Sequence, residues 1–114
     1  MSKRRDVDLI QDIIESIERI IFYTHNMEYA NFVKDYKTQD AVIRNIEILG
    51  EAAKLISLNL KDDYPDISWK NIAGTRDKLV HDYFGINIDI VWNIIKEDIP
   101  ELSQNIKQIL QNLK

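Results

Sequence analysis

The chain has 114 residues, enough for one domain with a single hydrophobic core but too few for a TIM barrel or a complete dinucleotide-binding fold. Its 15 Lys and Arg against 19 Asp and Glu give a formal net charge of −4. This balance excludes binding to nucleic acid by bulk charge, which needs a basic surface. The absence of Cys excludes disulfides, thiolate zinc sites and Cys catalysis, and with only two His we expect no metal site and no cofactor.

The spacing of apolar residues predicts helices along nearly the whole chain. The first is expected over residues 7–21, where aliphatic side chains recur every three or four positions. One helical turn is expected around residues 29–33. Thr38 is then predicted to cap a long helix that ends near Asn59. The expected core stripe of this helix consists of Val42, Ile46, Leu49, Ala53 and Ile56.

A break is predicted over residues 62–66, because Pro65 lacks an amide hydrogen and restricts the residue before it. A short turn over residues 67–72 leads into a helix from Gly74 to about Phe84. From residue 88 to 113 one apolar stripe continues across Pro100, which predicts one kinked helix or two stacked ones. The sequence therefore predicts an all-α, single-domain helical bundle of about four to five helices over residues 1–114.

The sequence also predicts where the protein resides. The basic residues at the start are not followed by an apolar leader, and no segment reaches the roughly 18 apolar residues that a membrane span needs. We therefore expect a cytoplasmic protein with no membrane association.

Residues 73–84 carry the most informative side chains. On a helical wheel, Arg76 falls in the middle of an apolar arc. Its guanidinium cannot lose its charge, so it needs an anion, a polar groove or a partner chain. Asp77 and His81 lie one helical turn apart, so the carboxylate can hold the imidazole and favour its charged form. Spacing alone leaves a structural role open for His81, and a core position open for Tyr83.

The predicted long helix carries charged residues opposite its core stripe. One interpretation is a ladder of surface salt bridges. The other is that Glu47 or Glu51 neutralises Arg76 or orders a site around it. The charged stripe consists of Arg44, Glu47, Glu51 and Lys54.

Arg76, His81 and Tyr83 together form the pattern R-x4-H-x-Y, with the polar Asp77 directly after the Arg. This pattern resembles the signature of HEPN-domain ribonuclease toxins, in particular the HepT-like family found beside minimal nucleotidyltransferase (MNT) antitoxins. Residues 38–54, TQDAVIRNIEILGEAAK, resemble the second helix of that family. The resemblance extends over nearly the whole chain.

The resemblance implies an endoribonuclease toxin of a type VII-like toxin–antitoxin system, a homodimer whose two motifs face one cleft. We expect metal-independent cleavage of RNA, with His81 as acid and base and Arg76 stabilising the charge on the phosphate. Asp77 would orient His81, and Asn45 and Glu47 are supporting candidates.

The resemblance also implies how the toxin is neutralised, by transfer of AMP from the MNT antitoxin to Tyr83. The expected partners are RNA rather than DNA, a second copy of the chain and an MNT-type nucleotidyltransferase. Two other readings are a non-catalytic helical module that serves a nucleotidyltransferase as its binding subunit, and a purely structural bundle.

Overall fold

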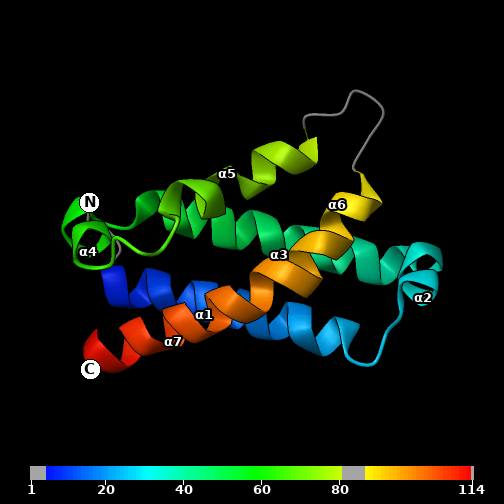
Figure 1. Cartoon of the computed structure of the whole chain (residues 1–114), viewed down its shortest axis with the longest axis horizontal. Helices are drawn as coiled ribbons and strands as arrows, with labels where there is room; N and C mark the ends of the chain where they lie inside the picture. The colour runs from blue at the N-terminus through cyan, green and yellow to red at the C-terminus, as the bar shows by residue number, and fades with distance from the viewer. Residues whose placement is uncertain (1–4, 81–86, 114) are drawn as a thin grey trace.

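The computed structural model describes residues 5–80 and 87–113, with only the helix backbone at positions 76–78 and 80. Within these ranges every regular element is a helix, which confirms the predicted all-α class (Figure 1). The elements are α1 (Asp6–Thr24), α2 (Tyr29–Lys34), α3 (Tyr36–Leu55), α4 (Leu58–Asp63), α5 (Trp69–Val80), α6 (Ile88–Asn93), the π-helical segment η1 (Ile94–Asp98) and α7 (Ile99–Leu113).

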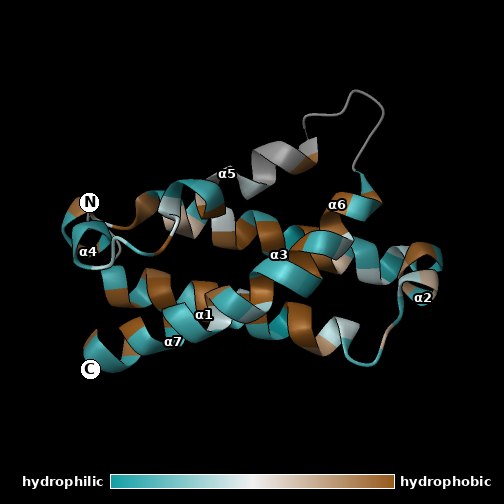
Figure 2. Cartoon of the chain, viewed as in Figure 1, coloured by the Kyte–Doolittle hydropathy of each residue, from teal (hydrophilic) through white to brown (hydrophobic). Residues whose placement is uncertain are grey.

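The bundle is built around α1 and α3, which pack side by side in opposite directions (Figure 1). Helix α5 packs against α3, and α7 packs against α1. Apolar and polar segments alternate along these helices, as amphipathic helices of a bundle require (Figure 2). The predicted core stripe of α3 is confirmed, because all five of its residues are buried. The other helices contribute buried residues that include Ile10, Ile13, Ile17, Leu79, Ile106 and Ile109.

Helix α3 begins earlier than the sequence predicts. Its N-cap is Asp35, not Thr38. The Asp35 carboxylate accepts hydrogen bonds from the Thr38 amide at 3.0 Å and from the Thr38 hydroxyl at 2.7 Å. These two hydrogen bonds lower the pKa of Asp35, because they favour its charged form. Thr38 therefore lies in the first turn as the donor to a cap that precedes it by three residues.

Helix α3 also ends earlier than predicted, at Leu55 rather than near Asn59. The reason is a second cap, because the Ser57 hydroxyl accepts a hydrogen bond from the Leu60 amide at 3.1 Å and starts α4. The Asp6 carboxylate accepts hydrogen bonds from both the amide and the hydroxyl of Ser57. The start of α1 is thereby joined to the corner between α3 and α4.

Helix α5 begins at Trp69, so the predicted start at Gly74 is wrong. Gly74 lies inside the helix, where an added Cβ would meet no atom within 4 Å. The predicted end of this helix, near Phe84, lies outside the described residues. The Trp69 indole donates a hydrogen bond to the Tyr64 carbonyl at 3.2 Å, which fixes the turn before α5.

Residues 88–113 form one continuous helical rod, which agrees with the first of the two alternatives for this region. Its irregularity is the π-helical segment, in which the Ile99 amide donates to the Ile94 carbonyl five residues earlier. Pro100 follows at once and has no amide hydrogen to donate. In the described parts of the chain, no helix is both long and apolar enough to cross a bilayer.

Candidate functional site

Helix α5 carries the first part of the R-x4-H-x-Y pattern. Leu79 is buried with 1% of its surface exposed, and Ile72 packs against the same core. Positions 72, 76 and 79 are spaced by four and three residues, so they share one face of the helix. Position 76 therefore lies on the face of α5 that packs into the bundle, which agrees with its place in the apolar arc of the helical wheel.

The other motif positions are less completely described. Asp77 lies on α5, but the structure gives only the backbone at Arg76 and Asp77. His81 and Tyr83 lie outside the described residues. The roles predicted for these four side chains therefore stay predictions.

Asn45 lies in the middle of α3, on the buried side of the helix, with 5% of its surface exposed. Its side-chain amide donates a hydrogen bond to the Ala41 carbonyl of the same helix at 2.8 Å. Its Oδ1 atom is buried and has no hydrogen-bond partner in the part of the chain that the structure describes. An unpaired buried acceptor costs about 1–3 kcal/mol. Such a group calls for a specific explanation, and a supporting role at the site is one.

Glu47 lies on α3 at a groove of about 390 Å³ between α1 and α3. Two further members of the predicted charged stripe, Arg44 and Glu51, line the same groove. Lys54 lies 4.0 Å from the Glu51 carboxylate, and both side chains are exposed, so this part of the stripe is a surface ion pair. The alternative, in which Glu47 or Glu51 neutralises Arg76, stays a prediction.

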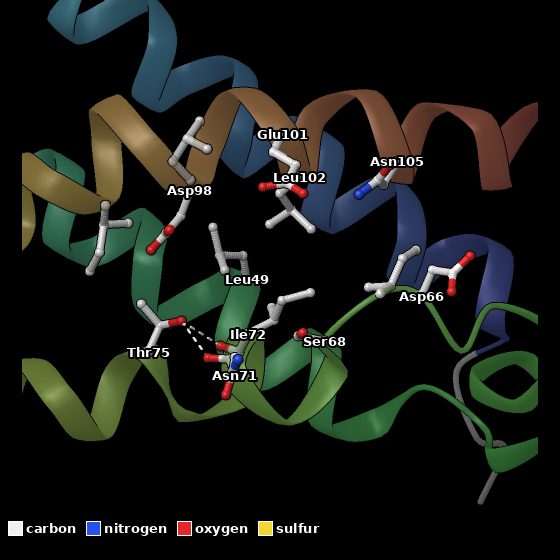
Figure 3. Close-up of a pocket in the computed structure, with 13 residues that line it drawn as sticks. Leu49, Asp66, Ser68, Asn71, Ile72, Thr75, Asp98, Glu101, Leu102 and Asn105 are labelled. Atoms are coloured by element: carbon white, nitrogen blue, oxygen red, sulfur yellow. Dashed lines mark hydrogen bonds between the residues drawn. The ribbon is translucent and has the colours of Figure 1, made fainter.

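A second groove lies between α5 and the η1–α7 rod, with a volume of about 270 Å³ (Figure 3). Sequence reasoning missed it, although the wall formed by α5 and the residue before it has a helical period in Ser68, Asn71 and Thr75. The Thr75 hydroxyl donates to backbone carbonyls of its own helix, at Asn71 and Ile72. Both walls turn side chains toward the space between them (Figure 3).

The rod after the motif is anchored by an aromatic cluster between α2 and α6. The Tyr29 hydroxyl donates a hydrogen bond to the Asp89 carboxylate, which raises the pKa of Tyr29. Trp92 packs against Tyr29 and Phe32, with ring centroids 6.0 and 5.2 Å apart. The Lys96 ammonium lies 4.7 Å from the centre of the Trp92 ring. These contacts fix the position at which the chain returns to the bundle after residue 87.

Within the described residues, no group of three or more His, Asp or Glu side chains could hold a metal ion. No solved structure gives a significant match to the chain.

Comparison with known proteins identifies the class. The profile of the family described as Ribonuclease HepT-like matches residues 13–109. A protein from Thermococcus cleftensis carries the name ribonuclease HepT. It is 43% identical over 107 residues, which cover 94% of this chain and 97% of the relative. A Methanocaldococcus jannaschii protein with an RNase name is 40% identical over 114 residues, covering 100% of this chain and 94% of the relative.

A bacterial relative gives the same result. A protein from Caldanaerobacter subterraneus subsp. tengcongensis that also carries an RNase name is 39% identical over 105 residues, covering 92% of this chain and 94% of the relative. The all-α fold and these matches define the class of protein as an endoribonuclease of the HEPN type. The chain belongs to the HepT-like ribonuclease family.

Proposed function

We propose that this chain is the toxin of a HEPN/MNT toxin–antitoxin system and that it cuts RNA internally with Arg76 and His81. The observation that carries the proposal is the match to the HepT-like family over residues 13–109, which contains the whole R-x4-H-x-Y pattern. Position 76 on the inward face of α5 supports it, because the permanent charge of an Arg at such a position needs an anion to match it. The RNA phosphate supplies that anion.

The proposed active form is a homodimer. Arg76 and His81 are five residues apart, so on a helix they diverge by about 140° and do not converge on one point. A second copy related by a two-fold axis provides the missing groups from the opposite side of a shared cleft. Each chain then contributes half of each active site.

The proposed chemistry is a transesterification that needs no metal ion. One His81 removes the proton from a ribose 2′-hydroxyl, whose oxygen attacks the adjacent phosphorus. The bond to the 5′-oxygen breaks, and the second His81 donates a proton to that oxygen. Arg76 binds the phosphate and stabilises the charge that develops on it. Asp77 orients His81, while Asn45 and Glu47 support the site from α3.

The test is the variant His81→Ala, with His25→Ala as the matched control. His25 is exposed at the end of α1, so its replacement removes the other imidazole of the chain without touching the motif. His81→Ala is expected to lower the rate of RNA cleavage by at least about 100-fold, the usual contribution of a general acid or base. His25→Ala is expected to cleave at the rate of the unmodified protein.

Circular dichroism and light scattering establish that both variants are folded and of equal oligomeric state. Cleavage in EDTA is expected to be unchanged. Full activity of folded His81→Ala, or activity that EDTA removes and magnesium restores, would contradict the proposed chemistry. A protein that cuts no RNA but still binds a nucleotidyltransferase would be the non-catalytic module instead.

Regulation by AMP transfer rests on Tyr83. The test incubates the chain with an MNT-type nucleotidyltransferase and ATP and follows the mass of the chain. Tyr83→Phe is expected to accept no AMP, whereas Tyr36→Phe, which removes the hydroxyl of a Tyr that is 74% exposed, is expected to accept it normally. Modification of Tyr83→Phe at the normal rate would show that another residue is the acceptor.

A further inference from the structure

The groove between α5 and the η1–α7 rod has an apolar floor and a polar rim (Figure 3). Leu49 of α3 lies at its base, between Ile72 of α5 and Leu102 of α7. On the α7 side, residues 98, 101, 102 and 105 all line the groove, so one face of the rod forms this wall. The groove is therefore built from two regular helix faces, and it is not a gap left by an irregular loop.

The rim of the groove carries three carboxylates. Asp66, Asp98 and Glu101 all line the groove. Within the described residues none of the three carboxylates forms an ion pair or accepts a hydrogen bond. Asp98 and Glu101 are three residues apart on one helix face, where like charges repel each other. A concave surface lined by one sign of charge concentrates the electric field and attracts ligands of the opposite sign.

The combination of apolar floor and anionic rim selects the chemistry of the occupant. Lys and Arg side chains bury an aliphatic stem and keep a cationic head at the surface, so they match both parts of the groove. An RNA backbone would bring phosphates against three carboxylates. A second copy placed on this face by a two-fold axis would bring the same carboxylates against each other. A basic segment of a different protein brings positive charge to these carboxylates and therefore avoids both kinds of repulsion.

We propose that this groove, lined by Asp66, Asp98 and Glu101, binds a basic amphipathic segment of a partner protein. The wall from Ser68, directly before α5, to Thr75 rises by about 10 Å, which corresponds to two turns of a docked helix. Such a helix places apolar side chains on the floor and Lys or Arg at the rim, as in other helix-in-groove complexes.

The groove borders the motif on α5, because Ile72 lines the groove and shares one helix face with position 76. Thr75 lines the groove, and position 76 lies about 100° further around the same helix. A segment bound in the groove would therefore lie beside the motif position on the same helix. The proposal does not depend on the identity of the RNA substrate or on cleavage itself.

The test measures binding of a fluorescein-labelled, 14-residue amphipathic helix of leucine and lysine to the full chain by anisotropy. A peptide of the same composition in scrambled order is the reference for unspecific attraction. The double variant D98N/E101Q is expected to raise the Kd of the amphipathic peptide by about tenfold, because two rim charges are lost. The matched control E18Q/D62N removes two exposed carboxylates outside the groove and is expected to leave the Kd unchanged.

A second variant tests the groove by shape. Asn71→Trp places a large side chain at an exposed groove position without changing the net charge, and it is expected to reduce peptide binding while RNA cleavage is retained. Equal Kd values for D98N/E101Q and E18Q/D62N, or equal binding of the scrambled peptide, would overturn the proposal. The proposal would also be overturned if the chain bound a short single-stranded RNA and D98N/E101Q raised the Kd of that RNA. Loss of the dimer in Asn71→Trp, seen by light scattering, would assign the groove to a second copy instead.

Discussion

Asn45 is the residue at which stability and function can be separated most clearly. Its amide group is paired with Ala41, but its Oδ1 atom is buried and unpaired among the described residues. Leaving a buried acceptor unpaired costs free energy, whereas an apolar side chain of similar size at the same position would not. A buried polar side chain that lowers the stability of the fold is typical of functional sites, where activity requires a residue that stability alone would not favour.

Asn45→Leu is therefore expected to leave the free energy of unfolding unchanged or to raise it by up to about 1 kcal/mol, while RNA cleavage falls. Urea unfolding and a cleavage assay on the same preparation measure the two effects. Val42→Ala, at a core position of the same helix, is the control and is expected to lower stability without a specific loss of activity per folded molecule. A large loss of stability in Asn45→Leu would assign Asn45 a purely structural role.

At the scale of the helix, α5 matters most because it carries the beginning of the motif. Leu79 lies near its described end and is 1% exposed, so it holds that end against the bundle. Replacing a fully buried Leu by Ala removes apolar contacts and leaves a cavity, at a cost of about 2–5 kcal/mol.

Leu79→Ala is expected to destabilise the protein by that amount and to lower cleavage by more than the folded fraction explains, because the helix that carries Arg76 is less firmly held. Leu58→Ala is the matched control, since this Leu is 75% exposed and its loss is expected to change stability by less than about 0.5 kcal/mol. Urea titrations at several temperatures give the free energy of unfolding of both variants. Equal effects of the two substitutions would show that Leu79 does not anchor α5.

The same scale shows what the sequence predicts and what it does not. Periodicity found the core stripe of α3 and the continuous apolar face of residues 88–113, because both depend only on residues three and four apart. The predicted starts of α3 and α5 are wrong. Asp35 rather than Thr38 caps α3, and Gly74 is tolerated inside α5. The groove between α5 and α7 could not be predicted, since it depends on how two distant segments pack.

The candidate site follows the same division. Arg76, His81 and Tyr83 could be selected from their pattern in the sequence alone. The burial of Asn45, and the lack of a partner for its Oδ1 atom among the described residues, could not be predicted. A polar residue in a helical stripe gives no sign of which neighbours surround it. Resemblance marked it as a candidate, and the core packing supplies a physical reason to test it.

For the whole molecule, the net charge of −4 sets how RNA can bind. If the dimer offers only Arg76 and His81 from each copy, at most four cationic groups meet the phosphates. For single strands, the logarithm of the binding constant falls with the logarithm of salt concentration with a slope of about −0.7 per phosphate contact. We therefore expect a slope of about −3 or shallower.

Fluorescence anisotropy with a 2′-O-methyl RNA, which cannot be cut, measures this slope between low and physiological salt. Arg76→Ala is expected to make it shallower by about 1.4, since two phosphate contacts are lost in a dimer. Lys61→Ala, a partly exposed Lys on α4 outside the motif, is the control and is expected to leave the slope unchanged. A slope steeper than about −6 would require an extended basic surface and would contradict a small cationic cleft.

The π-helical segment Ile94–Asp98 has a consequence for the phase of the last helix. One extra residue in a turn rotates everything that follows by about 100° relative to a regular α-helix. The same rod packs Trp92 against Phe32 of α2 at one end, while α7 packs against α1 at the other. Val91, Ile95 and Ile99 stay buried across this segment, so the wider turn keeps one apolar face continuous along the rod. Deleting one residue from the segment would turn α7 away from α1.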